Sequence, residues 1–121
     1  MNKLLFIMLV MISAFGAEAK ERVLLESKEE IIQQAVKELD DALIPPEGVL
    51  YKFGQKFAIK GEYNFQLTIR DKGNVVSVFV VDQKDGTIPS QNKLKDAILS
   101  FQLSFKMPKN KDYKFNYIFK F

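Results

Sequence analysis

The chain has 121 residues, of which 47% are hydrophobic, and it carries a formal net charge of +3 at pH 7. It contains no histidine, no cysteine and no tryptophan. These absences exclude catalysis by histidine or by a cysteine nucleophile, disulfide bonds, and zinc or copper sites built from His and Cys ligands.

The first 19 residues have the pattern of a secretory signal peptide. Lys3 supplies a positive start, residues 4–15 form an apolar segment that is short for a bilayer span, and Ala17-Glu18-Ala19 is an A-x-A cleavage site. We predict cleavage after Ala19 and export to a bacterial periplasm, the alternative being an uncleaved anchor. Removing 19 of the 121 residues leaves one domain of 102 residues, 20–121, without stable membrane insertion.

The first element of this domain is predicted to be a helix from Lys28 to about Ala42. Ser27-Lys28-Glu29-Glu30 matches a capping box, in which the Ser27 hydroxyl accepts the Glu30 N–H and the Glu30 carboxylate accepts the Ser27 N–H. Apolar residues then recur at helical spacing, at Ile31, Ala35, Leu39 and Ala42. Pro45-Pro46 ends the pattern.

The segment after these prolines is predicted to be extended. Val49 to Phe53 is interpreted as a strand and Lys56 to Lys60 as a second candidate strand, with Gly54 and Gly61 as breaks. The sequence leaves the pairing of these two segments open.

A β-hairpin follows. Phe65, Leu67 and Ile69 alternate with polar residues, which is the period of a half-buried strand. Asp71 to Asn74 has turn chemistry, and the β-branched run from Val75 to Val81 is predicted to return as the partner strand.

The remaining chain predicts a helix and a closing strand. The helix runs from Asn92 to Leu103, and its apolar face includes Ile98 and Phe101, both predicted to be core residues. Pro108 ends helical structure. From Tyr113 to Phe121, aromatic residues alternate with Lys114, Asn116, Ile118 and Lys120. The predicted fold is therefore α+β, a small antiparallel sheet of a hairpin plus a closing strand with two helices packed on one face.

The second half of the chain resembles the C-terminal domain of the TonB/TolA energy-transducer family. The similarity lies in Asp71 to Val81, in the helix with Leu94, Ala97 and Ile98, in Phe105-Lys106-Met107-Pro108, and in Tyr113 to Phe121. It does not extend to the family's Pro-rich linker or to its Ser-Ser-Gly signature. The resemblance implies a periplasmic domain that recruits extended peptides through a sheet edge.

No catalytic or metal site is predicted. Asp40 and Asp41 are adjacent on a helix and point in different directions, so they cannot act as a facing carboxylate pair. Asp82 and Asp85 lack the alternating oxygen ligands and the distal Glu of a calcium loop, and a plain loop is the better interpretation. We expect no enzyme activity and no cofactor.

Charge is unevenly distributed along the domain. Residues 20–48 contain four Lys/Arg and eight Asp/Glu, whereas residues 49–121 contain thirteen and six. A basic half can attract an acidic partner, anionic lipid or nucleic acid. The lysines are dispersed, which favours a role in keeping strand edges soluble, and export argues against nucleic acid.

The closing strand is the predicted partner site. Its backbone would accept an extended segment of another periplasmic or outer-membrane protein by β-augmentation, if the strand lies at a sheet edge. The predicted partner-binding residues are Tyr113, Lys114, Phe115, Asn116, Tyr117, Ile118 and Lys120. The alternative function is binding of a lipid or another hydrophobic ligand in an apolar groove.

Overall fold

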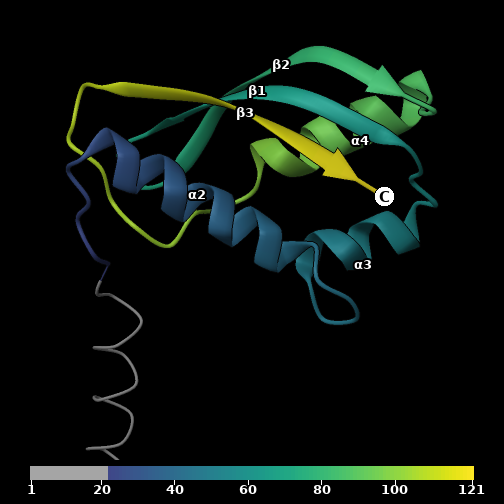
Figure 1. Cartoon of the computed structure of the whole chain (residues 1–121), viewed down its shortest axis with the longest axis horizontal. Helices are drawn as coiled ribbons and strands as arrows, with labels where there is room; N and C mark the ends of the chain where they lie inside the picture. Colours follow the sequence, from purple (N-terminus) through teal and green to yellow (C-terminus); the bar gives the residue numbers. More distant parts are fainter. Residues whose placement is uncertain (1–21) are drawn as a thin grey trace, which may run out of the picture.

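The domain is built on a three-stranded antiparallel sheet. The computed structural model describes residues 22–121, so the predicted signal peptide lies outside the described residues. The strands are β1 (Glu62–Arg70), β2 (Asn74–Lys84) and β3 (Asp112–Lys120). Their spatial order is β2-β1-β3, which places the first strand of the hairpin in the centre and both other strands at edges (Figure 1).

Helices cover one face of this sheet. They are α2 (Lys28–Ala42), α3 (Val49–Lys56) and α4 (Ile88–Leu99). Figure 1 shows all three on the same side, with the other face of the sheet left open. The predicted α+β class, with helices on one face of a small antiparallel sheet, is confirmed. The described chain has one helix more than the two that were predicted.

The additional helix is α3, and it corrects two predicted strands. Val49 to Phe53 lies in α3, and Lys56 to Lys60 holds the end of that helix and a turn. Periodicity cannot distinguish a strand from a helix in so short an apolar run. Contacts made far along the chain favour the helix here: Gly54 faces Phe121 so closely that an added Cβ would lie 2.6 Å from the Phe121 ring.

The predicted bounds of α2 are confirmed, but the predicted capping box is not observed. Ser27 occupies the N-cap position in an extended conformation, and its side chain makes no capping hydrogen bond. Its carbonyl accepts the Ile31 N–H at 2.9 Å, the first hydrogen bond of the helix. The capping motif therefore predicted the start of the helix correctly, although the side-chain hydrogen bonds of a capping box are not formed.

The helix α4 begins and ends four residues earlier than predicted. Thr87 is its N-cap, with the hydroxyl accepting the Ser90 N–H at 3.2 Å, and Pro89 lies in the first turn. Proline is compatible with that position because its missing N–H has no partner within the helix. The predicted core residue Ile98 is fully buried, whereas Phe101 lies beyond the helix end and is half-buried.

The hairpin turn is the one that the sequence predicts. Gly73 has φ +84° and packs against the loop after α4, where an added Cβ would lie 2.7 Å from the Leu103 carbonyl oxygen. Its own carbonyl accepts the Leu103 N–H at 3.0 Å. Two irregularities interrupt the register of β1 with β2, at Asn64/Phe65 and at Thr68/Ile69. Because of these irregularities, the valines of β2 do not alternate strictly between the buried and the open face of the sheet.

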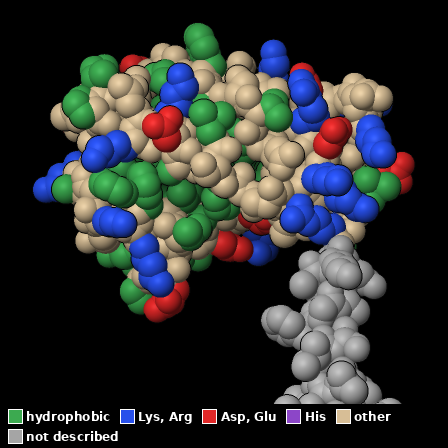
Figure 2. Space-filling model, turned by 180° about the vertical axis from the view of Figure 1, so that it is seen from behind, with side chains coloured by type: hydrophobic (Ala, Val, Ile, Leu, Met, Phe, Trp, Pro, Cys, Tyr) green, Lys and Arg blue, Asp and Glu red, His purple; other side chains and the backbone are tan. Residues whose placement is uncertain are grey.

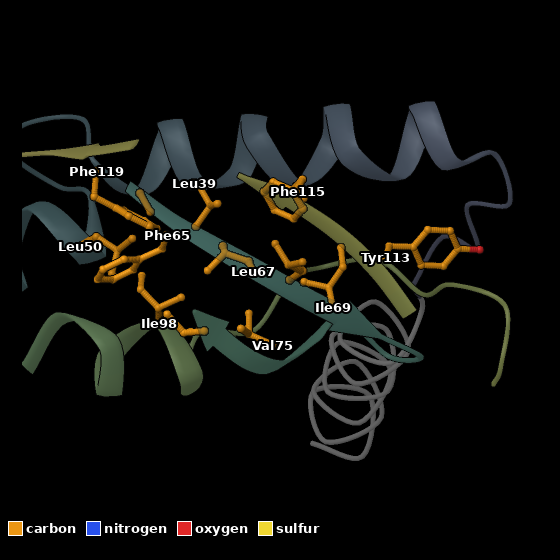
Figure 3. Packing of buried hydrophobic residues seen from close by; sticks show 14 of the residues in the cluster. Leu39, Leu50, Phe65, Leu67, Ile69, Val75, Ile98, Tyr113, Phe115 and Phe119 are labelled. Atoms are coloured by element: carbon orange, nitrogen blue, oxygen red, sulfur yellow. The ribbon is translucent and has the colours of Figure 1, made fainter. Parts of the chain in front are cut away.

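The core lies between the sheet and the helices (Figure 3). Its centre is the inner face of β1, whose side chains are almost completely buried against both long helices and β3. These residues are Tyr63, Phe65, Leu67 and Ile69 from β1, Ile31 and Leu39 from α2, Leu94 and Ile98 from α4, and Phe119 from β3. Burying such side chains supplies the main favourable free energy of folding.

Candidate partner-binding edge

The strand β3 forms one edge of the sheet and contributes nine residues to it. Its pairing with β1 runs without interruption from Glu62 opposite Lys120 to Arg70 opposite Asp112. In Figure 1 it is the yellow arrow that ends near the C-terminus, with α2 along its inner side. The structure thus places the predicted closing strand where a further strand could be added.

The register decides which backbone groups of β3 face outward. The Phe121 N–H donates to the Gly61 carbonyl at 3.0 Å, just beyond the last pair of the ladder. In an antiparallel pair, hydrogen-bonded and non-hydrogen-bonded residue pairs alternate. Every second residue before Phe121 therefore bonds to β1. The residues between them, including Lys114, Asn116 and Ile118, direct their N–H and C=O groups away from the sheet.

The side chains of β3 divide in the same alternating way. Among the predicted partner-binding residues, Tyr113 and Phe115 are buried beneath the sheet, and Tyr117 is half-buried. The other four lie on the open face, and all are exposed. These residues are Lys114, Asn116, Ile118 and Lys120. An incoming strand would meet these four side chains, while the aromatic residues support β3 from inside.

Both ends of β3 are held in place. At the start, the Arg70 guanidinium donates to both carboxylate oxygens of Asp112, at 2.6 and 3.1 Å. This hydrogen bonding from Arg70 holds the pKa of Asp112 below its usual range. At the far end, the Phe121 ring packs edge-on against Tyr63 with centroids 6.4 Å apart. A preorganised edge binds a partner with a smaller loss of conformational entropy.

Tyr117 links the middle of β3 to α2. Its hydroxyl donates a hydrogen bond to the Asp40 carboxylate. Burial, this hydrogen bond and the negative charge of Asp40 hold the pKa of Tyr117 well above its ordinary value. Asp40 therefore has a structural partner, and its neighbour Asp41 pairs with Lys37 at 2.9 Å.

This link predicts a dependence of stability on alkaline pH. The raised pKa means that the folded state holds the Tyr117 proton more tightly than the unfolded state, where tyrosine titrates near pH 10. The resulting stabilisation is present below about pH 10 and is lost as the pH rises above it. We expect urea denaturation to show that the stability advantage of the natural protein over Tyr117→Phe shrinks between about pH 9 and pH 11.5. A constant advantage would contradict the link.

The opposite edge, β2, was not predicted as a site and differs in character. Its two register irregularities interrupt the row of backbone groups, and α4 packs beneath it. Phe79, opposite Gln66, is 63% exposed on the open face of the sheet. The run of valines around Phe79 predicts a strand but does not show that a large aromatic side chain stays exposed.

Metal-site geometry is absent from the described part of the chain. Within residues 22–121, no group of three or more acidic side chains lies close enough to hold a metal ion. The plain loop predicted at Asp82 and Asp85 begins later than expected: Asp82 lies within β2, where its carboxylate accepts the N–H of Gln83 at 2.8 Å, and only Asp85 follows the strand.

Across residues 22–121, none of the helices combines the length and the apolar character needed to cross a membrane.

Comparison of the chain with protein-family models, with curated proteins and with solved structures finds no match.

Proposed function

We propose that this protein is a non-catalytic, exported interaction domain that binds an extended segment of another periplasmic or outer-membrane protein by strand addition along β3. The observation that carries the proposal is the outward row of N–H and C=O groups at Lys114, Asn116 and Ile118, inferred from the register of β3 with β1. A peptide strand bonds to such a row through its main chain.

The two edges of the sheet are not equivalent, and their difference favours β3. A bulge leaves residues unpaired and twists a strand, which is one way in which proteins protect an edge from pairing. The register of β2 has two such irregularities, whereas the register of β3 with β1 has none. Proline also protects edges, and β3 contains none.

Charge adds a preference for the partner. Lys114 and Lys120 project from the open face on either side of Asn116 and Ile118. Exposed lysines discourage pairing between identical basic edges, but they attract an acidic strand and increase its rate of association. We therefore propose an extended segment with Asp or Glu residues as the partner. The resemblance of residues 71–121 to the TonB/TolA C-terminal domains supports the same mode of binding.

Amide hydrogen exchange tests this proposal residue by residue. In the free domain, we expect fast exchange at Lys114, Asn116 and Ile118 and slow exchange at Phe115 and Tyr117, because only the latter two donate to β1. An acidic extended peptide, selected from a displayed peptide library, should slow exchange at the first three amides.

The same measurement shows when the proposal is wrong. Slow exchange at Asn116 and Ile118 in the free domain would mean that the β3 edge is already occupied or covered. Protection by the bound peptide that appears along β2 or α2, and not along β3, would place the partner site elsewhere.

A further inference from the structure

A second surface feature lies away from the β3 edge, between α3 and α4. It is a groove of about 700 Å³ with predominantly apolar walls. Figure 2, which shows the molecule from behind, shows hydrophobic side chains gathered on the side where these two helices lie, with Lys and Arg side chains around them. The side chains that matter most are Val49, Phe53 and Phe57 from α3 and its end, Lys93 and Ala97 from α4, and Phe101.

The groove exists because α3 and α4 do not pack closely against each other. Val49 is 60% exposed and Phe57 is 37% exposed, although each lines an apolar surface. Exposed apolar side chains that converge on a hollow of this size are typical of a ligand site, which usually measures about 300–1,000 Å³. The helix α3 that forms one wall lies outside the part of the chain that resembles the TonB/TolA domains.

Two lysines lie against one aromatic side chain of this groove, Phe57. The Lys93 ammonium lies 4.5 Å from the centroid of the Phe57 ring, and the Lys56 ammonium lies 5.4 Å from the same centroid. Neither forms a salt bridge with a carboxylate among residues 22–121. Lys93 and Asp96 line the groove, and Asp96 has no salt bridge in that range. Lys56 lies outside the lining but against the Phe57 ring, so the groove and its margin together carry two cations and one anion.

We propose that this groove binds an amphiphile with a single acyl chain and an anionic headgroup. The acyl chain would lie on Phe53, Ala97 and Phe101, and the headgroup would lie beside Lys93 and Lys56. Such a ligand covers the exposed apolar wall and supplies the carboxylate or phosphate that the two ammonium groups lack. A bare acyl chain would gain nothing from these exposed charges, and a cationic amphiphile would be repelled by them.

The test uses dodecanoate as the probe, below its micelle concentration, with dodecyltrimethylammonium as a control of equal chain length and opposite charge. Isothermal titration calorimetry should show one dodecanoate per chain, bound at least about tenfold more tightly than the cation. Methyl shifts in nuclear magnetic resonance spectra should change at Val49, Leu50 and Ala97. Equal binding of both probes, or shifts confined to the sheet, would overturn the proposal.

Variants separate the two parts of the site. Lys56→Glu combined with Lys93→Glu should weaken dodecanoate binding about tenfold, because it replaces two attractions by repulsions. Lys95→Glu is the control, on the same helix as Lys93 but neither in the groove lining nor against the Phe57 ring, and it should bind like the natural protein. Ala97→Trp should fill the groove and abolish binding. Undiminished binding by the folded double variant, or by folded Ala97→Trp, would overturn the assignment, and neither result depends on the β3 edge.

Discussion

Replacement of Asn116 by proline is expected to abolish binding of an extended peptide while the sheet stays folded. The Asn116 N–H points away from β1, so proline removes a donor from the free edge and none from the β1–β3 ladder. The preceding residue, Phe115, is in a strand, which is the conformation that proline favours in its neighbour. Binding of the selected acidic peptide, measured by calorimetry, is the readout.

Two controls make this result interpretable. Asn116→Ala removes the side chain and keeps the N–H, so it should bind nearly as well as the natural protein. Tyr117→Pro removes a donor to β1 and should destabilise the sheet, which circular dichroism and denaturation would detect. Normal peptide binding by a folded Asn116→Pro variant would rule out the β3 edge and direct attention to β2 or to the acidic helix α2.

Charge reversal examines the preference for an acidic partner separately. Changing both Lys114 and Lys120 to Glu should slow association of the acidic peptide and reduce its dependence on salt, because steering depends on exposed charges. The backbone edge is unchanged in this variant. An unaltered association rate would mean that the partner is recognised without its charge, even if Asn116→Pro still abolishes binding.

The second large effect is expected in the core. Phe65→Ala should lower the free energy of unfolding by about 3–5 kcal/mol, the usual cost of truncating a buried phenylalanine. Phe65 is fully buried in the central strand, and its ring lies 5.5 Å from the Phe119 ring, centroid to centroid. Domains of this size are stable by only about 5–15 kcal/mol, so chemical denaturation should show a large loss or an unfolded chain.

Phe101→Ala is the comparison that tests the observed burial. The helical pattern of the sequence treats Phe101 as a core residue of α4, but the helix ends at Leu99 and Phe101 is half-buried beside the groove. We expect its truncation to cost about half as much as that of Phe65, because fewer packing contacts are lost. Equal losses for both variants would show that Phe101 belongs to the core.

Local patterns in the sequence were sufficient for the elements that bury a regular face. The four apolar residues of α2 at helical spacing, and the alternation of Phe65, Leu67 and Ile69, leave one arrangement in which each face is buried. A one-residue shift in the pairing of β1 would turn Phe65, Leu67 and Ile69 together toward the open face of the sheet. For this reason the long helix, the hairpin and the closing strand, and with them the α+β class, could be predicted from the residues alone.

The tertiary structure decided the conformation and the placement of the short or irregular segments. Val49 to Lys56 forms a helix through packing that includes Gly54 against Phe121, a contact that no local pattern encodes. The outward direction of the Asn116 backbone follows from the register of β3 with β1, since the side-chain pattern fixes the buried face but not the neighbouring strand. The groove arises because α3 stands apart from α4. Each of these features depends on segments distant in the chain, whose relative placement is set only when the core is packed.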